Sequence, residues 1–228
     1  MTERELLRLH IEAVWDLTLP AINETLHELV LTQRLPPWSL YVGEFAQEQV
    51  AIWHSAVAPA QRLPLLEQAR QARVDDNKAF AMHQEVVFHY PIIGPAQQAQ
   101  AQQQARVLSV DDTDLINTFE VGSAPIFLKL RNAPCIGVIV DGYLLSVAHI
   151  SRQTASACEL GIDTLPEARG RGYATAATIL WTTLVQQKGL VPIYSAHAEN
   201  TASLHLAKTT GYMPQIHGVY GPMPEGSE

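Results

Sequence analysis

Cys158-Glu-Leu-Gly-Ile-Asp-Thr-Leu-Pro-Glu-Ala-Arg-Gly-Arg-Gly-Tyr-Ala-Thr-Ala-Ala177 is the stretch that decides the fold. It predicts a β-strand that turns through glycines into the first turn of a helix. Gly170 and Gly172 let the backbone adopt positive φ, so successive N–H groups can point at one anion near the positive end of the helix dipole. With Arg169 and Arg171 beside them, the turn suits a pyrophosphate, although Gly-x-Gly alone is also found in ordinary surface turns.

Two other nucleotide-binding loops do not fit this stretch. The loop G-x-x-x-x-G-K-[ST] is excluded because no Lys-Ser or Lys-Thr follows the second glycine. The dinucleotide pattern G-x-G-x-x-G is unsupported because Ala174 and Thr175 stand where a third glycine is needed.

The glycine turn resembles Arg-x-x-Gly-x-Ala, the acyl-CoA loop of the GNAT superfamily of N-acyltransferases, through Arg169, Gly172 and Ala174. Downstream, Asn200 leads a segment that has a small residue three positions on, Ser203, and a closing Gly-aromatic pair. That segment is similar to the second motif of the same family. The two motifs stand in the family's order, which is much more specific than either motif alone.

The resemblance covers about residues 105–220 and implies an α/β (α+β) fold with a mixed, mostly antiparallel sheet and flanking helices. Residues 105–228 are then an acetyltransferase-like domain, preceded by a mainly helical accessory region over residues 1–104. The accessory region shows no motif of chemistry. It supplies acceptor specificity, a surface for a homodimer, or a cap that packs on the domain.

The same resemblance implies acetyl-CoA (coenzyme A) as cofactor and transfer of the acetyl group to a primary amine, which attacks the thioester directly. In the family, pantetheine lies between two strands that separate and bonds to the strand before the glycine turn, while backbone N–H groups of the turn take the pyrophosphate. The cofactor-binding residues implied in this way are Ile162, Asp163, Thr164, Arg169, Gly170, Arg171, Gly172, Tyr173, Ala174, Asn200 and Ser203. Asn200 also stands where a helix begins, and asparagine is among the best N-caps.

Acyl transfer to an amine requires a base for the ammonium proton and an acid for the departing thiolate. Glu159, on the strand before the turn, is the candidate base, and a surface carboxylate on an alternating strand is the alternative. His197, on the strand that borders the expected cleft, is a candidate base or substrate contact, and a structural histidine is the alternative.

The general acid departs from the family pattern. Many members carry a tyrosine seven residues after the motif asparagine, and Ala207 stands at that position here. Three readings stay open: Tyr212 or His205 replaces the tyrosine, water protonates the thiolate, or the domain is a non-catalytic acyl-CoA-binding module.

Charge and composition limit the classes of partner that the chain is expected to bind. The formal charge is −8, with 7 basic against 12 acidic residues in 1–104 and 8 against 11 in 105–228. Neither half has the basic surface that would attract nucleic acid or an anionic membrane. The nine histidines show no H-E-x-x-H spacing and the two cysteines are not paired in sequence, so no metal site is expected.

Cysteine usage and hydropathy indicate the compartment. Cys135 and Cys158 fit free thiols in a reducing environment. No signal segment opens the chain, and its most apolar run, residues 135–150, is interrupted by Asp141 and His149. We therefore expect a cytoplasmic protein. The family resemblance implies that its partner is a small-molecule or peptide amine.

Apolar spacing predicts mostly helices in the first part of the chain. The expected helices are two within residues 3–34, broken at Pro20, and two more over 44–55 and 59–72. Short strands are expected over 40–42 and 85–90, and the run 96–105, rich in Gln and Ala, is a solvated helix or a linker.

The second part of the chain is predicted to alternate strands and helices. Asp111 is the expected N-cap of a helix that runs to Glu120, and Asp141-Gly142 is a strong hairpin signal. The expected strands are 107–110, 126–130, 135–140, 143–151, 156–164 and 192–197, and the later helices are 171–188 and 200–210.

Overall fold

The computed structural model describes residues 1–33, 36–46, 48–74, 82–128 and 134–222. The chain forms two compact units, which interleave along the sequence. The first unit holds Met1–His89, Ser195–Leu204 and the chain from Pro214 on, and the second holds Tyr90–Tyr194 and His205–Met213. The expected division after residue 104 therefore differs from the observed one, because segments near the C-terminus return to the first unit.

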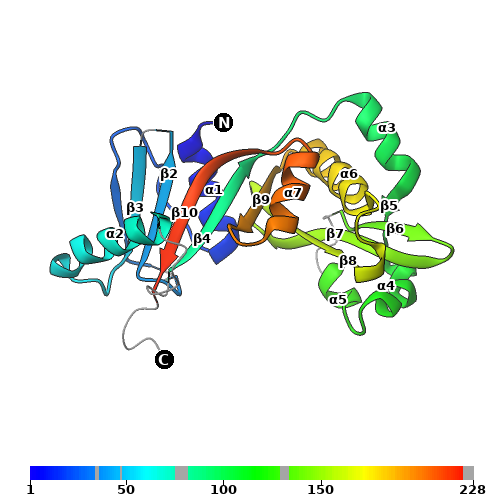
Figure 1. Cartoon of the computed structure of the whole chain (residues 1–228), viewed down its shortest axis with the longest axis horizontal. Coiled ribbons are helices and arrows are strands. Elements are labelled where there is room, and N and C mark those ends of the chain that lie inside the picture. The colour runs from blue at the N-terminus through cyan, green and yellow to red at the C-terminus, as the bar shows by residue number, and fades with distance from the viewer. Residues whose placement is uncertain (34–35, 47, 75–81, 129–133, 223–228) are drawn as a thin grey trace. The chain divides into compact units, whose positions relative to one another are not determined.

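The first unit is built on a sheet with the strand order β1-β3-β2-β10-β4. Its strands are β1 Glu28–Leu31, β2 Leu40–Phe45, β3 Glu48–His54, β4 His83–His89 and β10 Met213–Gly221. β1 runs parallel to β3, whereas β2 is antiparallel to both β3 and β10. In Figure 1 the red β10 lies beside the blue β2, which it joins from the other end of the sequence.

Helices α1 Glu3–Trp15 and α2 Pro59–Val74 complete the first unit. α1 begins at Thr2, whose hydroxyl oxygen accepts from the N–H of Glu5. Its Leu7 packs so closely on β2 that a Cβ at Gly43 would lie 2.8 Å from a leucine methyl carbon. α2 packs its alanines against an apolar cluster formed by Leu40, Val42, Ala51, Trp53, Val57 and Val219.

The prediction of a mainly helical region over residues 1–104 is wrong in two places. The first helix ends at Trp15, where Asp16 adopts left-handed φ of 51°, and the expected second helix contains strand β1 instead. The helix expected over 44–55 is the end of β2 and all of β3. Burial explains the second error, since the apolar run of β3 is covered on both faces and shows no strand alternation.

Other predictions for this region are confirmed. Strands form at 40–42, within β2, and at 85–89, within β4, which ends one residue before the expected end, and the helix over 59–72 is α2. The Gln- and Ala-rich run is a helix, α3 Pro95–Gln104, rather than a linker.

The second unit is built on a sheet with the order β9-β8-β7-β6-β5. Its strands are β5 Ala105–Val107, β6 Ile136–Val140, β7 Tyr143–Gln153, β8 Ala157–Thr164 and the start of β9 Val191–His197. All neighbours are antiparallel except β8 and β9, which are parallel. The expected mixed, mostly antiparallel sheet with flanking helices is confirmed.

Helices cover both faces of the second unit's sheet. α3 and α6 Tyr173–Gln187 lie together on one face, where Ala148, Ile150 and Cys158 pack against Trp181 and other α6 residues. α4 Thr113–Phe119 and α5 Ala124–Phe127 lie on the opposite face, as Figure 1 shows. The site described below belongs to this sheet.

Turns of the second unit follow the sequence closely. Asp141 and Gly142 both have positive φ, 52° and 82°, as a two-residue hairpin between β6 and β7 requires. Gly189 ends α6 with φ of 75°. The strand expected over 126–130 is wrong for its first two residues, which lie in α5, and its last two lie outside the described residues.

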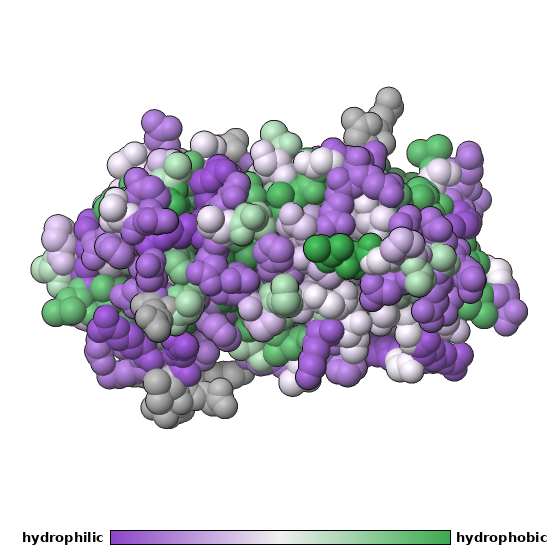
Figure 2. All heavy atoms as spheres, turned by 90° about the horizontal axis from the view of Figure 1, so that it is seen from above, coloured by the Kyte–Doolittle hydropathy of each residue, from purple (hydrophilic) through white to green (hydrophobic). Residues whose placement is uncertain are grey.

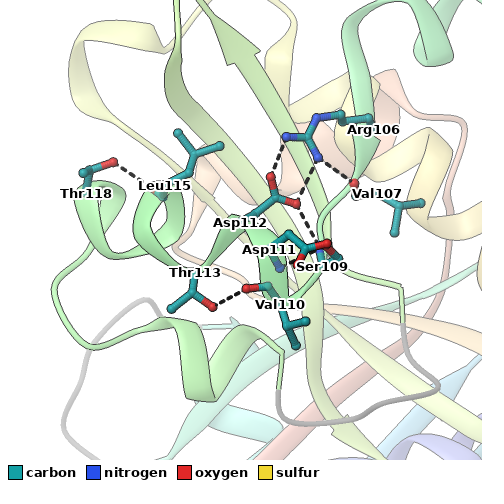
Figure 3. A network of polar contacts seen from close by, with 9 residues as sticks. All are labelled: Arg106, Val107, Ser109, Val110, Asp111, Asp112, Thr113, Leu115 and Thr118. Carbon is teal, nitrogen blue, oxygen red and sulfur yellow. Dashed lines mark hydrogen bonds and ion pairs between the residues drawn. The ribbon is translucent and has the colours of Figure 1, made fainter.

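Figure 3 shows a polar network that joins β5 to the start of α4. Arg106 donates from both terminal nitrogens to the two oxygens of Asp112, at 3.0 and 2.6 Å. The same carboxylate accepts from the N–H of Ser109, and the Ser109 hydroxyl accepts from the N–H of Asp111. The expected N-cap at Asp111 is therefore wrong: Ser109 caps the short 3-10 helix Val110–Asp112, which leads into α4.

The surface drawn in Figure 2 has hydrophilic residues over the whole face, with hydrophobic ones between them. Exposed large apolar side chains occur both in helices and in connecting segments, and include Leu63, Ile92, Val110 and Val121. None of the helices in the described ranges combines the length and apolar character that a membrane crossing requires.

Replacing Asp112 by Ala tests the network. The hydrogen bonds from Arg106, which outweigh burial, hold the pKa of Asp112 below its usual range. We expect Asp112→Ala to lower the free energy of unfolding by about 1 kcal/mol at pH 7. Because a lowered carboxyl pKa stabilises the fold above its unfolded value, about 3.9, the difference should vanish as pH falls through the folded pKa. Urea unfolding measures both effects.

Asp114→Ala is the matched control, since Asp114 is an exposed carboxylate in the first turn of α4. It should change the free energy of unfolding by less than about 0.5 kcal/mol. An equal loss in both variants would show that the network with Arg106 adds nothing beyond a helix-terminal charge.

Candidate functional site

The site is built on β8, whose two edges are paired unequally. β7 pairs with β8 from Cys158 to Thr164. The parallel register with β9 covers three pairs and ends at Glu159 opposite Ile193. The following segment, residues 160–164, therefore has a strand on one side and no described ladder with β9 on the other. In the described register, the backbone groups on that side therefore have no ladder partner on β9.

A glycine turn follows β8 and opens α6. After the 3-10 turn Pro166–Ala168, Gly170 and Gly172 have φ of 74° and 81°, in the left-handed region. A Cβ built at either glycine would meet no atom within 4 Å, so open space surrounds the turn. Gly172 is the N-cap of α6 and brings no side chain to satisfy the first N–H groups of the helix.

The groups at this turn suit an anion. The side chains of Arg169 and Arg171 are exposed, and Arg169 Nε donates to the Thr164 carbonyl at 3.4 Å. Tyr173 and Ala174 begin α6 and are half-buried. The first N–H groups of α6, the positive end of its dipole and two exposed arginines thus lie close together in the sequence, a combination that suits an anion.

Asn200 and Ser203 begin α7 Thr201–Thr209. Asn200 Oδ1 accepts from the N–H of Ser203 at 3.1 Å, which confirms the N-cap expected from the sequence. Both residues belong to the first unit, whereas the glycine turn belongs to the second. Their approach to the cofactor stays a prediction.

Glu159 lies at the last pair of the β8–β9 register, and its side chain is only 10% exposed. Its Oε2 accepts from Arg152 Nη1 at 2.9 Å and from the Ser151 hydroxyl at 2.7 Å. Both donors lie on β7. These contacts engage the carboxylate between the two strands and favour the structural alternative over the role of base.

Tyr212 and His197 lie in different surroundings. Tyr212 is buried, and its hydroxyl is 2.8 Å from the Thr182 hydroxyl of α6; burial raises its pKa well above the ordinary value. A buried, hydrogen-bonded phenol is a poor proton donor to an outside thiolate. His197 is the exposed last residue of β9, with its ring 6.1 Å from the ring of His83.

His149 was not recognised from the sequence as a site residue. It lies on β7 opposite Gly161, and its Nε2 is 3.5 Å from Oδ2 of Asp163. The Asp141-Gly142 hairpin joins β6 to β7 and gives only a starting point for predicting which β7 residues lie opposite β8. Counting the register from that turn alone does not suffice, because both β7 pairings contain irregularities.

Neither cysteine is placed for chemistry. Cys135 and Cys158 are free and buried, and burial raises the pKa of each thiol to about 12. Such thiols stay protonated and unreactive at neutral pH. Within the described ranges, no three His, Cys, Asp or Glu side chains are grouped so as to hold a metal ion.

Comparison with known proteins gives a family match to part of the chain. A family model described as GNAT acetyltransferase matches residues 130–217. A GCN5-related N-acetyltransferase-like protein from Streptococcus suis 89/1591 is similar in structure, with a TM-score of 0.54 and 16% identity over 84% of this chain and 86% of that one. At this identity the likeness establishes a common fold. No curated protein matches the chain.

Two further structures are less similar. An acetyltransferase from the GNAT family of Colwellia psychrerythraea is 16% identical, with a TM-score of 0.47, over 67% of this chain and 61% of that one. Aminoglycoside N-acetyltransferase AAC(6')-Iy in complex with CoA is 18% identical, with a TM-score of 0.40, over 49% and 92%. The chain spans 63% of the length of a similar protein from Novosphingobium aromaticivorans DSM 12444.

Glu159→Gln separates the two roles of this carboxylate. If Glu159 holds β7 and β8 together, the substitution lowers the free energy of unfolding by about 1 kcal/mol, because the charged bond from Arg152 is lost. Turnover with acetyl-CoA and any accepted amine should then change less than about twofold. Urea unfolding and initial rates of thiol release measure the two quantities.

Arg152→Gln is the control, since it removes the other partner of the pair. It should cost about the same free energy of unfolding. A loss of turnover above about 100-fold in Glu159→Gln alone, with acetyl-CoA binding intact, would identify Glu159 as the base.

Proposed function

We propose that the chain is an N-acetyltransferase that uses acetyl-CoA to acetylate a primary amine, since residues 130–217 match a GNAT acetyltransferase family model. One observation carries the proposal. β8 loses its β9 ladder after Glu159 and leads directly into a glycine turn that opens α6. A strand edge that can receive an amide-containing chain and a turn that can receive a pyrophosphate thus follow each other along the chain.

The residues fit the two parts of coenzyme A. Along residues 160–164, backbone groups of Ile162, Asp163 and Thr164 hold the pantetheine arm, whose amides need strand-like partners. Open space around Gly170 and Gly172 admits the pyrophosphate close to the backbone.

N–H groups of residues 170–174, including Tyr173 and Ala174 at the start of α6, bind the phosphate oxygens. Arg169 and Arg171 add positive charge at the rim of the turn. For Asn200 and the small Ser203, contact with the cofactor arm stays what the family resemblance implies, and the N-cap bond fixes their spacing. Because the backbone of the turn does most of the binding, bulk at Gly172 is more harmful than loss of the Arg171 side chain.

The bound acetyl-CoA supplies an acetyl group activated as a thioester. The chain's own residues orient that group along β8 and hold the acceptor amine beside it, so that the amine attacks without a covalent enzyme intermediate. With Ala207 at the position of the family's tyrosine and Tyr212 buried, water gives the proton to the thiolate. The acceptor is a primary amine on a small molecule or a peptide.

A non-catalytic acyl-CoA-binding module is the second candidate. It is favoured by Ala207, which stands where many members of the family carry a tyrosine, and by the burial of Tyr212. Turnover with a panel of amines separates the two candidates, since a binding module takes up acetyl-CoA and releases no thiol.

Thermal stability in the presence of acetyl-CoA tests the cofactor. At about 100 times Kd, binding should stabilise the fold by ~2.7 kcal/mol, which raises Tm by roughly 5–10 °C for a chain of this size. ATP and NAD are the comparators, because each also carries a polyphosphate. An equal shift with all three would mean that the turn binds phosphate without selecting coenzyme A.

Gly172→Glu tests the glycine turn. The new side chain projects into the proposed pyrophosphate site with a like charge, so Kd for acetyl-CoA should rise at least about 100-fold. Isothermal calorimetry measures the affinity. Gly189→Glu is the matched control because Gly189 lies at the other end of α6 with nearly the same φ.

Gly189→Glu should destabilise the fold like Gly172→Glu, since both place a glutamate in the left-handed region. It should leave Kd for acetyl-CoA within about twofold of the wild-type value. Near wild-type affinity in Gly172→Glu would refute the assignment of the turn.

A further inference from the structure

The imidazole of His149 lies on the face of the β7–β8 pair that is turned toward α5, and His149 belongs to neither family motif. His149 on β7 is the register partner of Gly161 on β8. Its ring lies over that glycine, because a Cβ at residue 161 would come within 2.5 Å of both Cε1 and Nε2. The missing side chain at Gly161 is therefore what makes room for the ring.

One ring nitrogen faces a carboxylate. Nε2 of His149 lies 3.5 Å from Oδ2 of Asp163, longer than an N–H···O bond. The Asp163 side chain is 56% exposed and that of His149 10%. Nδ1 is buried without a hydrogen-bond partner in the described chain, and the Phe127 ring of α5 packs on the imidazole at 4.5 Å. Nε2 is thus the nitrogen next to the exposed carboxylate.

Few other charges lie near this ring within the described ranges. α5, α6 and β6 pack against β7 and contain no charged residue. α4 contributes the exposed Asp114, and β8 contributes Glu159, whose carboxylate is held by Arg152 of β7 itself. Asp163 is the ionisable group that the structure places beside His149.

We propose that His149 is the general base of the acetyl transfer and that Asp163 is a positioning residue that draws the acceptor ammonium to it. The inference rests on the proposed function, because Gly161 lies within residues 160–164, the segment proposed to hold pantetheine. Leu160 and Ile162 pack on the apolar core beneath α6, which fills the other face of that segment. The acceptor therefore meets the thioester from the His149 side.

Two acceptors 3.5 Å apart, with no hydrogen bond joining them in the described chain, form a place for an ammonium, which donates to both. One proton passes from the ammonium to Nε2. The freed lone pair forms the bond to the thioester carbonyl carbon, and the C–S bond breaks. The attacking nitrogen loses a second proton through water, the thiolate takes one, and the imidazolium returns its proton to solvent. One proton is released for each acetyl group transferred.

The test compares His149→Gln with wild type in two measurements. Calorimetry should give the same Kd for acetyl-CoA within about threefold, because the ring binds no part of the cofactor. Turnover with the best amine of the panel should fall at least about 100-fold at pH 7, the usual contribution of a general base.

The pH profile distinguishes a base from a packing residue. Without the base, only the free amine reacts, so kcat/KM of His149→Gln should rise about tenfold per pH unit from pH 7 to 9, while wild type levels off. A loss independent of pH would overturn the proposal. His27→Gln, at an exposed histidine of the first unit, is the matched control and should match wild type at every pH.

Asp163→Asn is a second test of the proposal, and it can be carried out even if His149→Gln, at a buried position, fails to fold. Asp163 is exposed, so the variant should fold, bind acetyl-CoA normally and show an acceptor KM raised about tenfold. Unchanged KM and kcat would overturn the proposal. If wild type binds acetyl-CoA but acetylates no amine, the base assignment fails; if wild type does not bind acetyl-CoA, the proposed function itself fails.

Discussion

Backbone N–H and C=O groups of a strand need hydrogen-bond partners, and β8 finds them on β9 only from Ala157 to Glu159 in the described register. The next five residues keep β7 on one side and offer their other edge. The glycine turn that follows can bring bare N–H groups to the same ligand, because Gly170 and Gly172 accept left-handed φ. The proposed cofactor site depends on this unequal pairing more than on any side chain.

The two faces of the second unit's sheet differ in character: one packs an apolar core and the other carries the imidazole of His149. One face is closed by α3 and α6, whose apolar side chains pack on Ala148, Ile150 and Cys158. The other carries shorter helices and holds the imidazole of His149 above Gly161. A rigid core on one face keeps β8 and the turn in place, so that polar chemistry can occupy the other face. If the proposal holds, the groups that bind the acceptor are not part of either motif.

Local patterns predicted turns and caps well and the strands of the first unit poorly. The glycine turn, the Asp141-Gly142 hairpin and the Asn200 cap depend on neighbours within a few residues, so the sequence is sufficient for them. β2 pairs with β10, which lies at the other end of the chain, and no local periodicity reports such a partner. In the candidate site, the glycine turn was predicted from the sequence. The contact of Arg152 with Glu159 and the position of His149 opposite Gly161 were not, because both depend on how β7 pairs with β8.

Hydrogen exchange of backbone amides with and without acetyl-CoA tests the central claim most directly, since it reads the backbone groups themselves. We predict slower exchange for amides of residues 160–164 and 170–174, and no change at Gly189, which has a similar positive φ at the other end of α6. Protection that is absent from residues 160–174, or that ATP produces equally, would contradict the proposal that the free edge of β8 and the glycine turn together bind coenzyme A.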